Sequence, residues 1–131
     1  AVRQNGLAFR HASADLRRDR EVTLEAVRQN HQVLGAVSDE FRRDRELVLA
    51  AVRQNGLALR FASSDLRRDR AVALEAVRRH GHALKFVSRG LQGDREVVSE
   101  AVCQSGAALG FAPEFQSDRE VVLEAVRTHG V

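Results

Sequence analysis

A short group of polar side chains recurs along this 131-residue chain, at a spacing of 25 residues. Arg-Gln-Asn ends the apolar stretches at 3–5, 28–30 and 53–55, and Arg78-Arg79-His80 takes its place in the next copy. Helical-repeat proteins address RNA bases with two or three polar side chains per repeat. The sequence therefore raises RNA binding as one hypothesis. The candidate ladder comprises Arg3, Gln4, Arg28, Gln29, Arg53, Gln54, Arg78 and Arg79.

Two features of the sequence weigh against reading RNA through this ladder. Glutamates share the same outer arc of the expected helix, where they would repel phosphate and pair with arginines at i, i+3. The chain has neither Tyr nor Trp, and its Phe residues fall at expected core positions, which leaves no platform for stacking bases. We therefore favour a solvated, self-paired surface. The glutamates are Glu25, Glu75, Glu100 and Glu124.

A second group of arginines precedes the apolar stretches. Arg-Arg-Asp-Arg occurs three times and gives way to Gln92-Gly93 and then to Gln116-Ser117. Cations beside a helix N-terminus oppose the helix dipole, so local stability does not account for them. We predict a basic edge that docks a protein partner with an acidic surface, and a merely solvated surface is the alternative. The edge comprises Arg17, Arg18, Arg20, Arg42, Arg43, Arg45, Arg67, Arg68 and Arg70.

The sequence lacks the convergent set of unlike groups that an enzyme needs. His80 and His82 form an H-x-H pair, but no carboxylate or thiol recurs nearby at metal-ligand spacing. Cys103 occupies a position that other repeats give to arginine, and a lone cysteine forms no intrachain disulfide. We expect no catalytic residues, no cofactor and no metal site.

The composition is that of a folded domain with little net charge. Hydrophobic residues make up 44% and charged residues 30% of the chain, and the formal net charge is +3. Every basic residue except Lys85 is arginine. No stretch approaches the roughly 18 apolar residues of a membrane span. The chain has no Met and opens inside the recurring phrase, so we expect a fragment of a longer array.

The polar groups recur because the whole sequence repeats. The phrase at 118–130 has close copies that begin at Asp19, Asp44, Asp69 and Asp94. A fixed period of this length indicates a solenoid, in which neighbouring units share one core. We predict an all-α fold, an α-solenoid of stacked helix-turn-helix repeats of about 25 residues. The single array spans 1–131, with partial units 1–18 and 118–131 and full units 19–43, 44–68, 69–93 and 94–117.

Each unit predicts two helices. In the first, around 44–56, apolar positions cover an arc of roughly 200°, twice the stripe of about 100° that one packed surface requires. This helix is therefore expected to have neighbours on two sides. Residues 57–63 predict a shorter second helix of about two turns, with Phe61 filling the space between layers. Ser63 then predicts a cap for a brief closing turn.

Polar residues and glycines mark the ends of the first helix. An aspartate before each apolar stretch suits an N-cap, because its carboxylate accepts from first-turn N–H groups. A glycine after each stretch predicts a left-handed C′ residue, and His31 replaces it once. The expected caps are Asp19, Asp44, Asp69, Asp94, Asp118, Gly56, Gly81 and Gly106.

The repeated phrase resembles that of a known family. D-R-E-V-V-L-x-A-V-x-Q-N-G, followed by L-x-x-A-S-x-x-L, is similar to a domain family of unknown function. That family occurs in tandem arrays in microbial eukaryotes and some intracellular bacteria. The resemblance covers the whole chain and implies a helical repeat, without supplying an activity, a substrate or catalytic residues.

These observations predict a non-catalytic protein–protein interaction or scaffold module, such as a peripheral subunit of a larger assembly. An extended surface of stacked repeats suits that role. The alternative is an RNA-binding repeat module that uses the ladder and the basic edge. A third hypothesis is a spacer or regulator of an enzyme encoded in flanking sequence.

Overall fold

The computed structural model describes residues 19–129, and every regular element in this range is helical. This confirms the predicted all-α class. The predicted partial unit 1–18 lies outside the described residues, together with four candidate site residues. These are Arg3, Gln4, Arg17 and Arg18.

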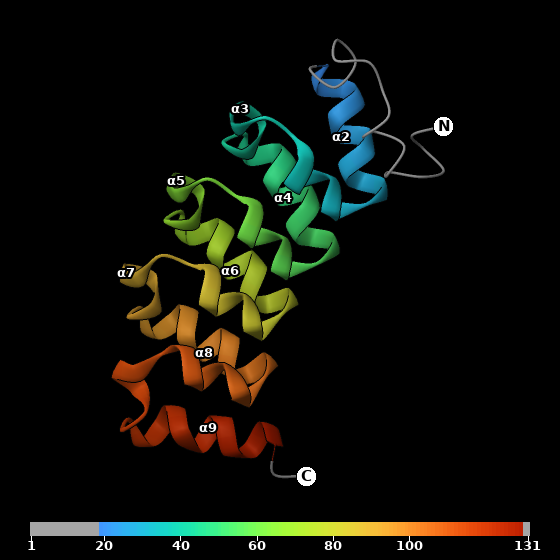
Figure 1. Cartoon of the computed structure of the whole chain (residues 1–131). Coiled ribbons are helices and arrows are strands. Elements are labelled where there is room, and N and C mark those ends of the chain that lie inside the picture. The colour runs from blue at the N-terminus through green and yellow to red at the C-terminus, as the bar shows by residue number, and fades with distance from the viewer. Residues whose placement is uncertain (1–18, 130–131) are drawn as a thin grey trace.

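Five long helices form one row in sequence order, shown from blue to red in Figure 1. Each long helix packs on the next one, so the row follows the chain rather than closing round a central point. This arrangement confirms the predicted solenoid. The helices are α2 (Arg20–Gln29), α4 (Arg45–Gln54), α6 (Arg70–Arg79), α8 (Arg95–Gln104) and α9 (Arg119–His129).

A second row consists of short 3₁₀ helices, each packed on the long helix before it and on the long helix after it. The predicted short second helix of about two turns is present in each of these units, in 3₁₀ form. In the third unit the Asn55 carbonyl accepts from the N–H of Ala58, at 2.9 Å, which starts an i→i+3 pattern over six residues. The helices are η2 (His31–Ala36), η3 (Gly56–Phe61), η4 (Gly81–Phe86) and η5 (Gly106–Phe111).

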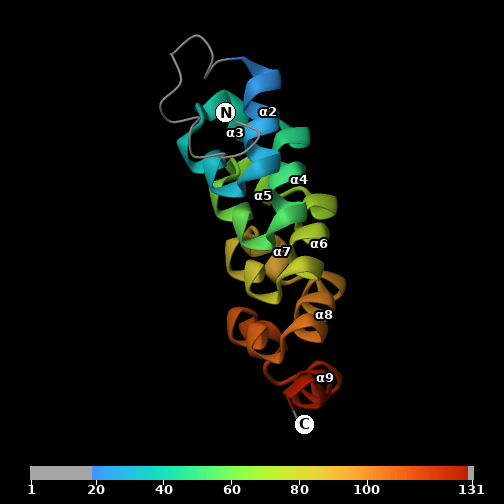
Figure 2. The same cartoon turned by 90° about the vertical axis from the view of Figure 1, so that its right-hand side faces the viewer.

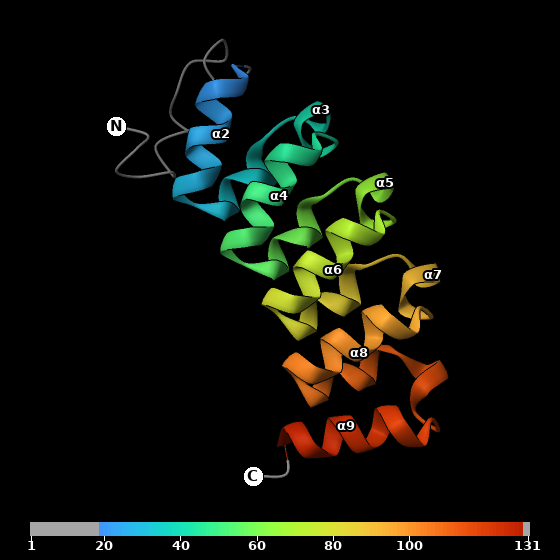
Figure 3. The ribbon, with the colours of Figure 1, turned by 180° about the vertical axis from the view of Figure 1, so that it is seen from behind.

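Each unit closes with one further short turn. Ser63 Oγ accepts from the N–H of Leu66 at 3.4 Å, whereas Ser38 makes no such side-chain cap. These turns lie in one line along an edge of the molecule, beside the second row (Figures 1 and 3). They are α3 (Asp39–Arg42), α5 (Ser64–Arg67), α7 (Arg89–Gln92) and, in 3₁₀ form, η6 (Pro113–Phe115).

The five aspartates occupy the N-cap positions of the long helices. Asp69 is typical, since its Oδ1 accepts from the N–H of Ala71 at 3.0 Å and from that of Val72 at 3.2 Å. Such a cap stabilises a helix by about 1 kcal/mol. The remaining caps are made in the same way by Asp19, Asp44, Asp94 and Asp118.

The prediction of left-handed glycine caps at Gly56, Gly81 and Gly106 is wrong. No described glycine has a positive φ, and the long helices end instead at an extended residue such as Asn55, with φ −155° and ψ 115°. Each glycine begins a 3₁₀ helix. His31 begins η2 after the same extended backbone at its N-cap, so the chain can leave a long helix without glycine.

Close packing between repeats accounts for the glycine at two of these positions. A Cβ on Gly56 would lie 2.2 Å from the carbonyl oxygen of Ala76, and a Cβ on Gly81 would lie 2.5 Å from that of Ala101. In both cases the oxygen belongs to the long helix of the next unit. The glycines therefore allow two backbones to approach, which is a tertiary requirement.

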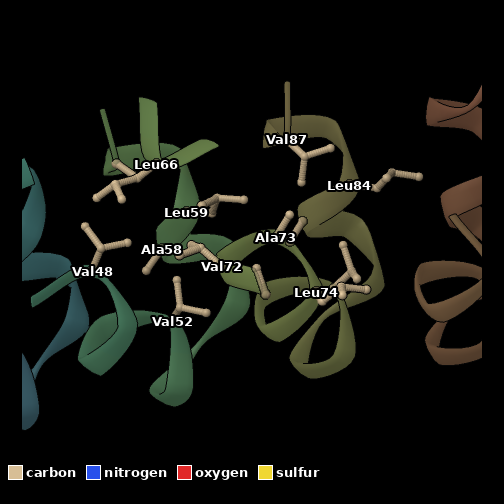
Figure 4. Packing of buried hydrophobic residues seen from close by; sticks show 14 of the residues in the cluster. Val48, Val52, Ala58, Leu59, Leu66, Val72, Ala73, Leu74, Leu84 and Val87 are labelled. Atoms are coloured by element: carbon tan, nitrogen blue, oxygen red, sulfur yellow. The ribbon is translucent and has the colours of Figure 1, made fainter. Parts of the chain in front are cut away.

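The core runs along the whole stack between the two rows. Val52, Leu59, Val72 and Leu84 are fully buried, and side chains from successive units interlock in Figure 4. Burial depends on having a following unit. Val126 of α9 is 57% exposed, because no further helix packs on α9 within the described residues. Its counterparts Val27, Val52, Val77 and Val102 are fully buried.

Figure 2 turns the stack by 90° and separates the two rows. The long helices follow one side of the stack, and the 3₁₀ helices with their closing turns follow the other. The solenoid therefore has two faces, which we call the long-helix face and the short-helix face.

We predict that Gly56→Ala destabilises the chain by at least about 2 kcal/mol, because the new methyl group overlaps the Ala76 carbonyl oxygen. Urea unfolding followed by circular dichroism measures the effect. Gly90→Ala is the control, since a Cβ there has no neighbour within 4 Å. Equal stability of the two variants would contradict the packing role of Gly56.

Candidate interaction surfaces

The first arginine of each long helix joins one repeat to the next. Nε of Arg70 lies 2.9 Å from Oδ2 of Asp94, and Nη1 of Arg95 lies 2.6 Å from Oδ2 of Asp118. Arg70 also pairs with Glu96 in the first turn of α8. The same contact joins Arg20 to Asp44 and Arg45 to Asp69.

These pairs correct the sequence-based account of the basic edge. Arg20, Arg45 and Arg70 do oppose the dipole of their own helix, but each contacts the N-cap carboxylate one unit further on. These arginines therefore link neighbouring units of the protein. Each aspartate then accepts from its own helix and from the preceding arginine, and we call this contact the arginine clasp.

The clasp lowers the pKa of the aspartates. For Asp44, Asp94 and Asp118 the main cause is the hydrogen bond from the arginine, with backbone N–H groups adding to it. For Asp69 the largest single influence is burial, which would raise the pKa. The combined hydrogen bonds from Arg45 and the backbone outweigh it and the pKa falls.

The arginine two residues before an N-cap aspartate donates a hydrogen bond within its own unit. Nη2 of Arg42 donates to the carbonyl of Gly35 at 2.6 Å, and Nε of Arg67 donates to that of Ala62 at 3.2 Å. In the next unit Gln92 donates its amide to the carbonyl of Leu84 at 3.1 Å. The change from arginine to glutamine along the sequence therefore preserves a donor to the end of the 3₁₀ helix.

The ladder on the long-helix face is also paired within the protein. Nε of Arg53 lies 3.6 Å from Oε1 of Glu75, and Nε of Arg78 lies 3.5 Å from Oε2 of Glu100. The expected i, i+3 pairing is wrong, because the partner is the glutamate of the next unit. Arg28 lacks this partner, since Ala50 stands at the corresponding position.

The other ladder residues make similar local bonds. Nε2 of Gln54 donates to the carbonyl of Val27 at 2.6 Å, one unit back. Nη2 of Arg79 lies 3.7 Å from Glu75, and the Gln29 amide lies 3.5 Å from Glu25. The ladder is thus largely a set of contacts between and within repeats.

The short-helix face contains two grooves of equivalent construction. The first, about 380 Å³, lies between α3 and α5, and the second, about 260 Å³, lies between α5 and α7. We call them the first and second basic grooves. The first is lined by one carboxylate, that of Asp39, and by Arg42, Arg43, Arg60, Phe61, Ser63 and Arg67, among others. The second is lined by Arg67, Arg68, Lys85, Phe86, Ser88 and Arg89, among others.

A cation lies beside a half-buried phenylalanine in each groove. The Arg60 guanidinium is 4.5 Å from the centroid of the Phe61 ring, and the Lys85 ammonium is 5.0 Å from that of Phe86. Neither cation forms an ion pair with a described residue, and the same holds for Arg89. Sequence reasoning placed Phe61 in the core and overlooked the cation before it.

The two faces differ in charge. Across η3, α5, η4 and α7, residues 56–68 and 81–93 hold five cations and one carboxylate, Asp65. Across α6 and α8, residues 69–80 and 94–105 hold four cations and five carboxylates. The excess positive charge in this part of the chain therefore lies on the short-helix face.

His80 and His82 have packing or capping roles, and Cys103 is a protonated thiol on the surface. His80 is the extended residue after α6, and the His82 ring packs edge-on against Phe111 with centroids 5.8 Å apart. A hydrogen bond with Glu124, and then burial, raise the pKa of the Cys103 thiol, which opposes thiolate formation. Within residues 19–129 no group of three or more His, Cys, Asp or Glu side chains is placed to hold a metal ion.

The helices between residues 19 and 129 are all too short or too polar to cross a lipid bilayer. A family model described as Domain of unknown function (DUF4116) matches residues 1–42, 44–92 and 94–131. The three matches confirm the tandem repetition, whereas the repeat phrase itself stays a prediction. Comparisons with curated proteins and with solved structures gave no match.

The arginine clasp predicts an acid-sensitive fold. The aspartates have a folded-state pKa below their ordinary value of 3.8, so their stabilisation is complete above that value and is lost as pH falls through the folded-state pKa. We expect urea midpoints to be constant above about pH 5 and to fall below about pH 4. Arg70→Ala should lower the midpoint at pH 7, and its effect should shrink as pH falls and Asp94 becomes protonated. An effect of Arg70→Ala that does not change with pH would contradict the clasp.

The donor role of Arg67 predicts that glutamine substitutes for it. Arg67→Gln should retain wild-type stability, because Gln92 makes the equivalent hydrogen bond in the next unit. Arg67→Ala should lower the free energy of unfolding by about 1 kcal/mol. Chemical denaturation of both variants measures the difference. A loss of stability as large in Arg67→Gln as in Arg67→Ala would show that the charge, and not the donor, matters.

Proposed function

We propose that this chain, which belongs to the family described as Domain of unknown function (DUF4116), is a non-catalytic protein-interaction module. It docks a protein with an acidic surface on the two basic grooves of the short-helix face. In a larger assembly it acts as a scaffold or a peripheral subunit.

The separation of charge between the faces is the observation that carries this proposal. Arginines of the long-helix face are paired with carboxylates of the next unit, such as Arg53 with Glu75. Arg60, Lys85 and Arg89 of the short-helix face have no such partner among the described residues. Unpaired cations around an apolar floor favour an acidic partner, because complementary charge speeds association and selects against basic surfaces.

The same observations disfavour RNA as the partner. Reading bases would require the ladder on the long-helix face, where Arg53 and Arg78 are turned toward glutamates. Stacking would require a fully exposed aromatic face, and the rings of Phe61 and Phe86 are half-buried with a cation over each, so only part of each ring is accessible. A protein partner needs neither feature.

The chemistry of the grooves supports a binding role without catalysis. Their linings contain neither histidine nor cysteine. Of the three serines that line the grooves, Ser63 and Ser88 have hydroxyls that accept from backbone N–H groups. Guanidinium and ammonium groups bind anions without acting as bases near neutral pH.

A charge-reversal experiment tests the proposal. The native protein and its partner are cross-linked and recovered, and the complex is then rebuilt with purified components. Arg60→Glu combined with Lys85→Glu should weaken the rebuilt complex at least about a hundredfold, which corresponds to roughly 3 kcal/mol.

The matched control combines Arg28→Glu with Arg127→Glu, which changes the net charge equally on the long-helix face. This control should bind the partner with an affinity within about threefold of wild type. Equal loss in both double variants, or recovery of RNA in place of a protein, would contradict the proposal.

A further inference from the structure

We infer that the two basic grooves bind one extended acidic segment of the partner, with carboxylates that recur at every third residue. This inference rests on the proposed function and adds the chemical form of the ligand. The distance between the two grooves sets the spacing of the ligand's carboxylates, and the cations require the ligand to be negatively charged. The substitutions between repeats set how many units the ligand crosses.

The grooves form one continuous track. Arg67 lines both of them, and each remaining position has a counterpart 25 residues further on, as Phe61 has in Phe86. The turns α3, α5 and α7 that separate the grooves lie in one line along the edge of the stack (Figure 3). A ligand that crosses both grooves therefore meets a cation, a phenylalanine and a serine in each, while Asp39 of the first groove is replaced by Ser64 in the second.

The spacing of the repeats selects an extended ligand. Packed helices lie about 8–10 Å apart, and this distance sets the step between equivalent positions of neighbouring units. A polypeptide in the polyproline II conformation advances about 3.1 Å per residue with three residues per turn, or roughly 9 Å per turn. Side chains at i and i+3 of such a segment thus point the same way at the interval of the grooves.

The cations and the aromatic floor divide the recognition between them. Arg60 in the first groove and Lys85 in the second can each bind one carboxylate, and arginine does so by donating two parallel hydrogen bonds. Phe61 and Phe86 are half-buried, so an apolar side chain between the acidic residues of the ligand has a surface to cover.

The track is two grooves long within the described units. The position of Arg60 and Lys85 is occupied by Gly35 in the unit before and by Gly110 in the unit after. The two glycines differ in what surrounds them. A Cβ on Gly35 would lie 2.7 Å from the Phe61 ring, whereas a Cβ on Gly110 has no neighbour within 4 Å. A new cation can therefore be added at Gly110 without displacing another group.

Three labelled probes test the register with the 131-residue chain. The first is a decapeptide with glutamate at every third position and leucine and proline between. The second has the same composition with its four glutamates contiguous, and the third is a uridine decanucleotide. Fluorescence anisotropy measures each dissociation constant at about 0.1 M salt, where exposed charges more than about 10 Å apart are largely screened and close contacts decide the binding.

We expect the spaced peptide to bind at least about tenfold more tightly than either other probe. Lys85→Ala should remove most of that preference, and Gly110→Lys should strengthen binding of the spaced peptide about threefold by adding a third cation to the track. Arg28→Ala on the long-helix face is the control and should change nothing.

Equal binding of the two peptides, tighter binding of the oligonucleotide, or no gain from Gly110→Lys would overturn the inference. The outcome separates it from the proposed function. If the spaced peptide fails while Arg60→Glu with Lys85→Glu still abolishes the rebuilt protein complex, the partner docks as a folded surface and only the extended segment is wrong. If both experiments fail, both ideas fall together.

Discussion

Burial of each repeat by the next is the interaction on which the rest of this structure depends. No single unit of about 25 residues has enough apolar surface of its own, so the core is continuous between units. The difference between Val102, fully buried under α9, and Val126, 57% exposed on α9, shows what one neighbour contributes. The glycines at positions 56 and 81 serve the same end, because they allow the next helix to approach at backbone distance.

The polar contacts follow from the same stacking. Placing N-caps one unit apart brings the first arginine of a helix within reach of the next aspartate, as Arg70 and Asp94 show. The ladder arginines meet glutamates across the same interval. Most charge on the long-helix face is consequently used between repeats. On the short-helix face Arg68 pairs with Asp65, whereas Arg60, Lys85 and Arg89 have no carboxylate partner among the described residues. The availability of these three cations is the physical basis of the proposed docking role.

The architecture could be predicted from the sequence because its causes are local and periodic. An aspartate before an apolar run caps a helix wherever it occurs, so Asp69 was placed by pattern alone. The apolar arc on both sides of the long helix likewise required neighbours on two sides. The role of Gly56 was predicted wrongly because it depends on a distant part of the chain. Its position after the helix suited a left-handed cap, whereas its cause is a carbonyl oxygen 20 residues further on.

The partners of the arginines could not be predicted, because periodicity shows which residues are equivalent and not which residues touch. Arg20, Arg45 and Arg70 were assigned to an outer edge, and they pair across the repeat boundary instead. The basic grooves had a weak signal in the sequence. One repeat position reads Arg10, Gly35, Arg60, Lys85 and Gly110, so a cation occurs there in some units and a glycine in others. A substitution confined to part of an array marks a local function more clearly than residues that recur in every unit.

The central claim is that the short-helix face binds the partner while the long-helix face holds the repeats together. Amide chemical shifts of the 131-residue chain, recorded by NMR as the partner is added, test this most directly. The account predicts that shifts concentrate at residues 60–68 and 85–89, and that the amides of α4 and α6 near Arg53 and Arg78 change little. Shifts centred on the ladder residues of α2, α4 and α6, with the grooves unaffected, would contradict it.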